Sequence, residues 1–303
     1  MADRRLQVFH AVAKQLSFTK AAEVLFMTQP AVTFQIKQLE EHFNTRLFDR
    51  GHGRISLTPA GETVLEYAER ILGLSSELDV RLAEMTGQIG GPLLVGASTT
   101  IAEFMLPRIL GEFKSQYPKV RPRLIVANSE SIEMRVAEHT LDIGLIEAPS
   151  HQNNLQCEVC CEDELLVICA SGSPLARHRE LTPQLLAGQP FVSREPGSGT
   201  REVTDGYFRD AGVAPESLNV VIELGSPEAI KGVVETGIGF AIVSRASVAK
   251  EKRLGDLLAI PLQPPLKRTL SMVYPKEKFR SRLVNTFIEF ATLKLRQFAA
   301  SQG

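Results

Sequence analysis

Residues 193–202 read SREPGSGTRE and carry the groups best suited to binding chemistry in this sequence. Its candidate binding groups are two glycines, the hydroxyls of the two residues beside them and two arginines: Gly197, Gly199, Ser198, Thr200, Arg194 and Arg201. Glycines let backbone N–H groups converge, while hydroxyl and guanidinium groups add donors and positive charge, and this combination holds small anions. A flexible turn before a capped helix is the alternative interpretation.

Polar side chains also stand at three other points where a predicted strand ends. Ser-Thr-Thr at 98–100 separates an apolar run from a helical pattern, where the hydroxyls bind an anion or simply cap the helix. Asn128 and Ser129 follow one further strand, and Glu147 follows another. Because ligands of open α/β sheets bind at the carboxyl ends of strands, we expect these groups to share one site.

The carboxylate of Glu147 is the one negative group of this expected site. It would repel an anion unless it is protonated or paired with Arg194 or Arg201. The candidate ligand-binding residues are Ser98, Thr99, Thr100, Asn128, Ser129, Glu147, Arg194, Ser198, Gly199, Thr200 and Arg201.

Motifs of catalysis are absent from the sequence: there is no G-x-S-x-G elbow, no Walker loop and no H-E-x-x-H pair. The six histidines are dispersed and none has an evident nucleophile partner. The residues therefore indicate binding rather than turnover, and we assign no catalytic residue. An enzyme that holds a phosphorylated metabolite on the glycine-rich loop is the alternative.

The four cysteines, Cys157, Cys160, Cys161 and Cys169, have no second Cys or His pair at zinc-ligand spacing. Strand packing is the favoured interpretation, with metal or redox chemistry as the alternative, so we expect no metal and no cofactor. The sequence shows neither a signal peptide nor an apolar run of membrane-spanning length, which predicts a cytosolic protein with reduced thiols.

The net charge of the chain does not by itself indicate a nucleic-acid-binding protein. The 303 residues have a net charge of -1, although the first sixty carry eight Lys and Arg against five Asp and Glu, a net +3. The elements of this segment are more informative. Helical patterns over 5–16, 17–25 and 28–43, with Thr28 as a cap and Pro30 in the first turn, predict a helix-turn-helix. RLFDRGHGRISLT, residues 46–58, then predicts a small β-wing.

Phe34 is a puzzle within the third of these helices. Val32, Ile36, Leu39 and Phe43 form the apolar face, and Phe34 falls nearly opposite it, among polar residues. An exposed aromatic ring suits contact with a thymine methyl group in the major groove of DNA. An isolated exposed apolar residue without a function is the alternative.

A longer helix begins at Thr58-Pro59. Its apolar positions are spaced by four and three residues over three heptads, with a break at Ser75, and are Val64, Ala68, Ile71, Leu78, Leu82 and Met85. This pattern favours a coiled coil that forms a dimer over a helix that packs only on its own domain. The stretch GQIGGP, residues 87–92, predicts a hinge.

From Pro92 onward apolar runs alternate with helical patterns, which predicts an α/β domain with mostly parallel strands. The runs are PLLVGA, PRLIVA, LDIGLIE, ELLVICA, PFVSR, NVVIEL, IGFAIVS and TLSMVY. About 210 residues are enough for two lobes.

Over essentially its full length the chain resembles the LysR-type transcriptional regulators. The residues that carry the resemblance are SFTKAAEVLFMTQPAVTFQIKQLEEHFNTRLFDR and LTPAGE, followed by the Gly-Gly-Pro hinge. The resemblance implies a winged helix-turn-helix domain (1–58), a dimerising linker helix (59–86), the hinge (87–92) and a two-lobed effector domain (93–303) like periplasmic binding proteins. Lobe I would span about 93–163 and 268–303, and lobe II about 164–267.

The same resemblance implies the DNA contacts. Gln29, Pro30, Thr33 and Phe34 match recognition-helix positions, and Arg54 fits the wing. Many members have Ser at Thr33 and Arg or another polar residue at Phe34. Candidates for phosphate contact are Thr19, Thr28, Lys37 and Arg50.

The segments GSGTRE, NSESI and DIGLIEAP look most like regulators of sulfur assimilation, sulfite response and carbon fixation. This resemblance implies a bacterial regulator that binds promoter DNA as a homodimer or homotetramer, with RNA polymerase as a further partner. Its effector would be a small anion between the lobes, either a sulfur oxyanion such as sulfite or a phosphorylated metabolite. An effector-independent DNA-binding protein is a further alternative.

Overall fold

The computed structural model describes residues 4–25, 27–51, 54–85, 89–255, 257–276 and 280–302. The chain forms two compact units, Met1–Gln88 and Ile89–Gly303, which divide within the segment predicted as a hinge. Residues 87 and 88 of that segment lie outside the described residues. No helix in the described part is long and apolar enough to cross a membrane.

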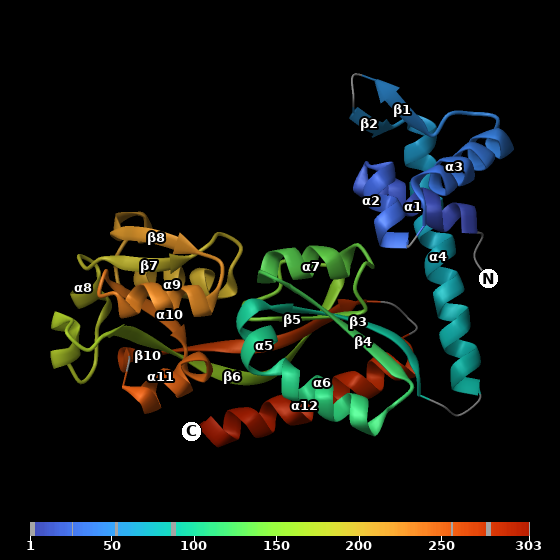
Figure 1. Ribbon diagram of the computed structural model, residues 1–303. Coiled ribbons are helices and arrows are strands. Elements are labelled where there is room, and N and C mark those ends of the chain that lie inside the picture. The colour runs from blue at the N-terminus through green and yellow to red at the C-terminus, as the bar shows by residue number, and fades with distance from the viewer. Residues whose placement is uncertain are drawn as a thin grey trace. The chain divides into compact units, whose positions relative to one another are not determined.

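The first unit is a winged helix-turn-helix followed by a long helix (Figure 1). Helices α1 (Arg4–Gln15), α2 (Phe18–Leu25) and α3 (Gln29–Phe43) precede the antiparallel strands β1 (Phe48–Gly51) and β2 (Arg54–Leu57) and helix α4 (Pro59–Met85). The ring of Phe48 anchors the wing in the helical core, 5.3 Å from the ring of Phe9 and 5.8 Å from that of Phe18.

Helix α3 follows its predicted face with one exception. Val32, Ile36 and Leu39 are buried, whereas Phe43 is 44% exposed, so its assignment to the apolar face is wrong. Asn44 in the left-handed conformation ends the helix directly after Phe43, where the face no longer meets the core. Thr28 takes the predicted N-cap position, although its side chain makes no cap hydrogen bond.

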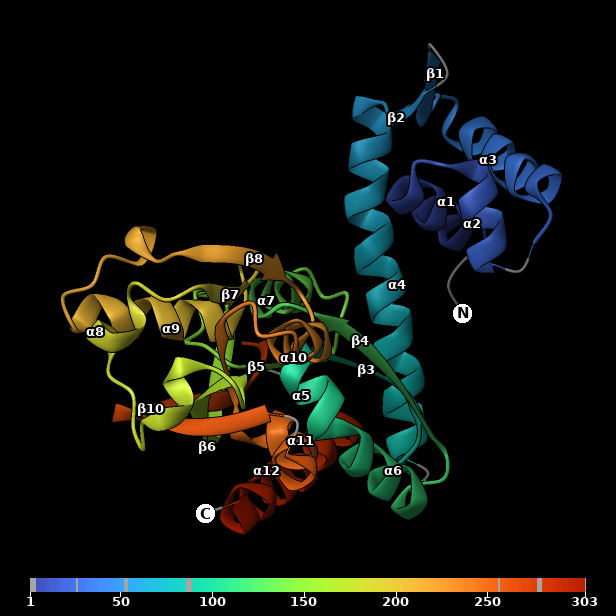
Figure 2. The ribbon, with the colours of Figure 1, turned by 60° about the vertical axis from the view of Figure 1, so that its left-hand side comes forward.

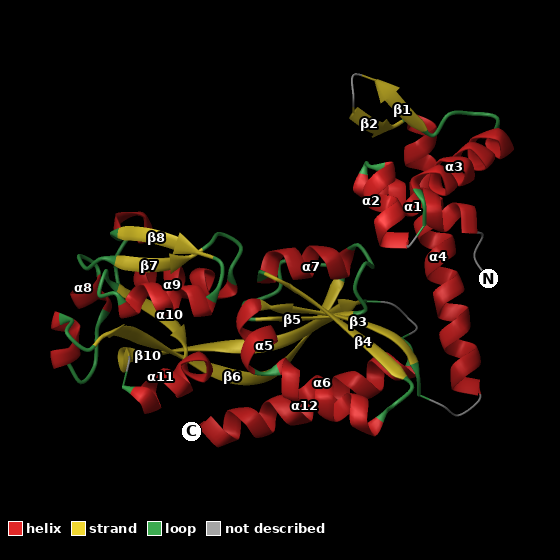
Figure 3. Ribbon diagram, in the orientation of Figure 1, coloured by secondary structure: helices red, strands yellow, loops and turns green. Residues whose placement is uncertain are grey.

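The second unit is built on one eight-stranded sheet of order β4-β3-β5-β10-β6-β9-β7-β8 (Figure 3). The strands are β3 (Gly91–Ser98), β4 (Val120–Ala127), β5 (Ile143–Ile146), β6 (Leu155–Ala170), β7 (Phe191–Arg194), β8 (Val220–Leu224), β9 (Phe240–Ser244) and β10 (Leu257–Pro275). All eight predicted apolar runs lie in or overlap these strands. The expectation of mostly parallel strands holds only toward the edges, because β10 runs antiparallel to β5 and β6, and β6 antiparallel to β9.

Hydrophobic clusters of each lobe flank the long central strands. Lobe I has helices α5 (Thr99–Phe104), α6 (Leu106–Gln116), α7 (Ser129–Ala137) and α12 (Arg282–Gln302), and Figures 1 and 2 show α6 and α12 side by side. Lobe II has α8 (Pro183–Leu186), α9 (Gly199–Asp210), α10 (Pro227–Glu235) and α11 (Ala249–Leu254). Both cores use aromatic pairs: Phe113 lies 5.1 Å from Phe287 in lobe I, and Phe191 stacks 4.9 Å from Phe240 in lobe II.

The strands β6 and β10 contribute to both cores. Along β6 the buried side chains pass from lobe I at Cys160 to lobe II at Leu165, and along β10 from lobe II at Leu266 to lobe I at Leu270. Since the two strands pair throughout this crossover, they form the connection about which the lobes are set.

Candidate functional site: a pocket between the lobes and an exposed helix face

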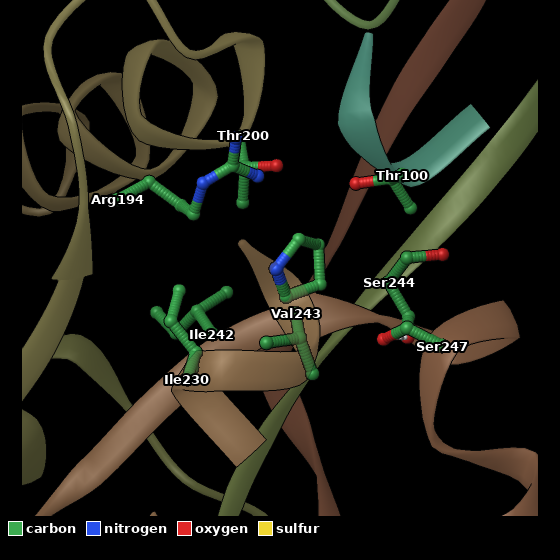
Figure 4. Close-up of a pocket in the computed structure, with 9 residues that line it drawn as sticks. Thr100, Arg194, Thr200, Ile230, Ile242, Val243, Ser244 and Ser247 are labelled. Atoms are coloured by element: carbon green, nitrogen blue, oxygen red, sulfur yellow. Dashed lines mark hydrogen bonds between the residues drawn. The ribbon is translucent and has the colours of Figure 1, made fainter. Parts of the chain in front are cut away.

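A small hollow lies between the lobes, which we call the interlobe pocket (Figure 4). It measures about 210 Å³ including the space open to solvent, and it is lined by Thr100, Arg194, Thr200, Pro227, Ile230, Ile242, Val243, Ser244 and Ser247. Thr100 comes from lobe I and the other lining residues come from lobe II. In Figure 4 the hydroxyls of Thr100, Ser244 and Ser247 lie on one side, and Ile230 and Ile242 lie on the other, below Arg194. The pocket therefore pairs hydrogen-bonding and apolar surfaces.

Arg194, at the end of β7, is the charged member of this described lining. Its side chain is 5% exposed. Its Nε and Nη2 donate to the two carboxylate oxygens of the adjacent Glu195, at 2.8 and 3.1 Å. Nη2 also lies 3.5 Å from the hydroxyl oxygen of Thr99 in lobe I. A buried guanidinium with hydroxyl neighbours suits a planar or tetrahedral anion.

Glu147, just after β5, does not face the pocket as a ligand group. Its carboxylate is 1% exposed and accepts hydrogen bonds from the hydroxyls of Ser98, at 2.5 Å, and Thr200, at 3.1 Å. The expected partners, Arg194 or Arg201, are wrong: Glu147 pairs with Arg268 of β10.

Arg268 joins both lobes at the crossover of the central strands. Besides Glu147 it pairs with Asp163 of β6, with Nε 2.8 Å from the carboxylate, and it donates to the Thr200 hydroxyl at 2.7 Å. Asp163 in turn accepts from Ser244 at 2.8 Å. We call Glu147, Arg268 and Asp163 the buried triad. The sequence carried a signal for it, because Arg268 falls in phase with the buried Leu266 and Leu270 of an alternating strand.

The triad holds its charges against the cost of burial. Burial raises the pKa of Glu147, but the Arg268 charge and the hydrogen bond from Ser98 outweigh it, so the pKa lies below its ordinary value. Burial likewise lowers the pKa of Arg268, and Glu147 and Asp163 more than compensate. Asp163 keeps a raised pKa, because burial exceeds the effect of Arg268 and Ser244. Glu147 is therefore the firmly ionised partner of Arg268.

Other predicted ligand residues lie near the pocket, but their side chains bind to other groups of the protein. Arg201 turns away from the pocket, since Nη1 donates to the Arg194 carbonyl at 3.0 Å and to Glu223. Asn128 caps α7 by accepting from the backbone N–H of Ser131 and donates to the carbonyl of Pro196 at 3.2 Å. Its neighbour Ser129 accepts from the backbone N–H of Glu147 at 3.3 Å.

The glycine-rich loop packs against lobe I rather than forming an open cradle. A Cβ on Gly199 would lie 2.9 Å from the carbonyl carbon of Glu147 and 2.9 Å from the Ser129 hydroxyl oxygen. Ser198 is buried at the N-cap of α9. Of the eleven predicted residues, three line the pocket: Thr100, Arg194 and Thr200. Sequence reasoning missed Ser244 and Ser247, although the hydroxyls of IVSRAS follow a strand in the same way as those at 98–100.

The outer face of α3 is open and polar around one aromatic ring. Phe34 is 57% exposed, and Gln29, Pro30 and Lys37 are exposed beside it, as are Thr19 and Thr28 nearby. The Thr33 hydroxyl donates to the carbonyl of Gln29 at 3.0 Å. Arg50 and Arg54 lie on the two paired wing strands, and their side chains lie outside the described ones.

The exposed apolar stripe of α4 differs from the predicted seam. Ala68 is fully buried in the core of its own domain and Val64 packs against that core, so their assignment to a dimer seam is wrong. Large side chains at spacings of four, three and four are exposed instead: Tyr67, Ile71, Leu74 and Leu78. Helix α1 and strand β2 pack against one side of α4, which shifts the free stripe around the helix. The side chains of Leu82 and Met85 lie outside the described ones.

The cysteines do not gather into a metal site. Within the described residues, no group of three or more His, Cys, Asp or Glu side chains is placed to hold a metal ion. Burial raises the pKa of Cys161 to about 12, with contributions from Cys160 and Asp163, and burial also raises the pKa of Cys160 and Cys169. These three thiols are poor nucleophiles at neutral pH.

Comparison with known proteins agrees with this architecture. Residues 4–62 match the family described as bacterial regulatory helix-turn-helix protein, lysR family, and residues 86–296 match the LysR substrate binding domain. The chain belongs to the LysR family of transcriptional regulators. This family consists of regulators rather than enzymes, so the enzyme alternative is not supported.

Within the family, the chain is similar to regulators of carbon fixation. The chain is 34% identical over 287 residues to a probable RuBisCO transcriptional regulator of Porphyra purpurea, which covers 93% of this chain and 90% of that protein. It is 33% identical to the transcriptional activator CmpR of Synechocystis, covering 94% and 93%. The Synechocystis CcmR regulatory domain, solved in complex with 2-PG, is 29% identical, with a TM-score of 0.62, covering 67% of this chain and 96% of that one. Full-length CbnR bound to its target DNA shares the fold, with a TM-score of 0.68 at 22% identity, covering 97% and 100%.

The buried triad predicts that replacing Arg268 destabilises the effector domain much more than replacing the neighbouring Lys267. Arg268→Met leaves Glu147 and Asp163 buried without a counter-charge, which should cost about 3–5 kcal/mol in the unfolding of the effector domain. Because the pKa of Glu147 lies below its ordinary value, this stabilisation is present at neutral pH and is lost as the pH falls through that lowered pKa. Urea unfolding followed by circular dichroism measures it.

Lys267→Met is the matched control. Lys267 pairs with Glu162 at 3.1 Å, but the two side chains are 59% and 65% exposed, so its loss should cost less than about 0.5 kcal/mol. Equal losses for the two variants would contradict the role of the triad.

Proposed function

We propose that this LysR-family regulator senses a small organic anion in the interlobe pocket, and that the anion binds Arg194. The observation that carries the proposal is the buried guanidinium of Arg194, with an apolar wall of Ile230 and Ile242 beside it. A bare oxyanion would leave that apolar wall unused. A phosphorylated or carboxylated carbon chain fits both surfaces, and the CcmR regulatory domain complex with 2-PG supports this class of ligand.

The pocket also suggests how binding would reach the DNA. Thr100 lies on lobe I and Arg194 on lobe II, so an effector that contacts both favours one angle between the lobes. A changed angle would alter how the subunits of an oligomer present their DNA-binding domains, and RNA polymerase would respond at the promoter. The protein would act in the cytosol, where promoter DNA is available.

The effector assignment predicts a selective thermal shift. In the full chain, 2-phosphoglycolate at about 100 times its dissociation constant should add about 2.7 kcal/mol of stability to the effector domain. The shift should be lost in Arg194→Gln and kept in Arg201→Gln, whose guanidinium faces Glu223. Calorimetric melting at constant ionic strength, with sulfite, sulfate and phosphate as comparison anions, measures it.

Two outcomes would change this proposal. A shift that depends on Arg201 instead of Arg194 would place the effector outside the interlobe pocket. No shift with any of these anions would remove the phosphorylated effector and favour the effector-independent regulator.

For DNA, we propose that α3 enters the major groove and that the exposed ring of Phe34 contacts a thymine methyl group. Thr28, Gln29, Pro30 and Thr33 lie on the first turns of the same helix, and Lys37 adds positive charge. Thr19 and the wing residues Arg50 and Arg54 would reach the phosphate backbone and the minor groove beside it.

The ring predicts a loss of sequence specificity. Phe34→Ala should weaken specific DNA binding by about 1–3 kcal/mol while leaving non-specific binding nearly unchanged, because only the base contact is removed. Fluorescence anisotropy with promoter and random duplexes measures both. Lys37→Ala serves as the comparison, since loss of a phosphate contact weakens both duplexes and lowers the salt dependence. If Phe34→Ala behaves in the same way as Lys37→Ala, the base contact is wrong.

We further propose that the exposed stripe of α4 pairs with the same stripe of a second copy. Its four, three, four spacing is that of a coiled-coil seam. Two such dimers would form the tetramer that the family resemblance implies.

The position of the stripe predicts which substitution breaks the dimer. Leu74→Asp puts a charge at a side chain that is 65% exposed at the centre of the stripe, and it should dissociate the dimer at micromolar concentration. Ser75→Asp, at the break of the originally predicted seam, should leave it intact. Analytical ultracentrifugation decides, and dissociation by Ser75→Asp alone would restore the sequence-based register.

A further inference from the structure

The cation proposed to bind the effector is already engaged by a carboxylate of the same chain. Glu195 accepts from Nε and Nη2 of Arg194 at 2.8 and 3.1 Å, which is the two-point geometry by which arginine clamps carboxylates and phosphates. Nη2 is shared with the hydroxyl oxygen of Thr99 at 3.5 Å. An anion that enters the pocket therefore meets a guanidinium whose Nε and Nη2 already donate to Glu195.

Glu195 is held far less firmly than Glu147, a fully buried carboxylate near the pocket. Glu147 is 1% exposed and is fixed by Ser98, Thr200 and Arg268. The side chain of Glu195 is 26% exposed, and its recorded partner among the described residues is Arg194.

The partial exposure of the Glu195 side chain also permits movement. The nearest atom that a Cβ on Gly225 would meet is the Glu195 carboxyl carbon, at 3.8 Å, so this neighbour does not press on the carboxylate. Since one edge of Glu195 already reaches solvent, a rotation about its side-chain bonds can exchange the Arg194 contact for water. No such exchange is open to Glu147.

We propose that Glu195 is a tethered competitor of the effector. It occupies Arg194 in the effector-free protein, and the anionic group of the effector displaces it from the same edge. The inference rests on the proposed function, because it requires that the effector binds Arg194. The tether lowers the apparent affinity by the fraction of molecules in which Arg194 is free, and so sets the effector concentration to which the regulator responds.

Competition by a tether has a property that simple charge repulsion lacks. The fraction of molecules with a free Arg194 is a property of the protein and does not depend on the ligand. Removal of the Glu195 carboxylate therefore changes the affinity of every ligand that needs Arg194 by the same factor. Repulsion by a nearby carboxylate would instead act more strongly on a multiply charged ligand than on a singly charged one. Two ligands of different charge therefore separate the two explanations.

The experiment is isothermal titration calorimetry of the full chain at constant ionic strength with 2-phosphoglycolate and, separately, glycolate. Glu195→Gln should tighten the binding of both ligands by about five- to tenfold, by a similar factor for each. Glu223→Gln is the matched control, because Glu223 is a nearby carboxylate of lobe II that pairs with Arg201. It should change both affinities less than twofold, and Arg194→Gln should abolish binding.

The outcomes separate the inference from the function on which it rests. Unchanged or weaker binding to Glu195→Gln, with binding still lost in Arg194→Gln, overturns the tethered competitor and leaves the proposed function standing. Equal gains in the Glu195 and Glu223 variants, or a gain confined to 2-phosphoglycolate, assign the effect to repulsion and also overturn it. Failure of both ligands to bind the parent chain and Glu195→Gln overturns the proposed function and the inference together.

Discussion

The ion pair between Arg268 and Glu147 is the interaction on which the effector domain depends. It lies where β6 and β10 pass from one core to the other, and Asp163 completes it from the neighbouring strand. Three charges are buried there because each one has a partner, and hydroxyls of both lobes satisfy the remaining lone pairs. A crossover without this pair would have to bury apolar side chains that fit both cores at once. With a buried ion pair at the crossover, each lobe can complete its own core independently.

This arrangement also determines what remains for a ligand. The hydroxyls of Ser98 and Thr200, and the start of α9, are used by Glu147. The polar groups of the glycine-rich loop therefore bind mainly to other groups of the protein. Arg194 is the charged residue among the described residues that line the pocket. Arg194, at the strand end before the loop, is therefore the group through which we propose that an anion binds.

Sequence reasoning succeeded where the signal is local and failed where two distant segments decide. The buried positions of α3, the wing and the eight apolar runs follow from periodicity, which the chain expresses over a few neighbouring residues. The partner of Glu147 depends on a strand 121 residues away, so the nearer arginines of the loop were the natural but wrong choice. The stripe of α4 was misplaced for a related reason: heptad spacing shows that apolar side chains share a face, but the packing of α1 and β2 against α4 decides which part of that face stays free. Thr100, Arg194 and Thr200 line the pocket because they lie at or shortly after the ends of β3 and β7, where the sequence pattern had indicated polar groups.

The lining of the pocket is divided unequally, and this has an evolutionary consequence. Lobe I supplies Thr100, while strands and helices of lobe II supply the other lining residues. The apolar members sit on α10 and β9, away from the buried triad, so their size and shape can change without disturbing a charge. Under the proposed function, substitutions within lobe II alone would therefore change which metabolite a duplicated copy of the regulator binds. The DNA-binding unit, the helix stripe and the crossover need not change with it.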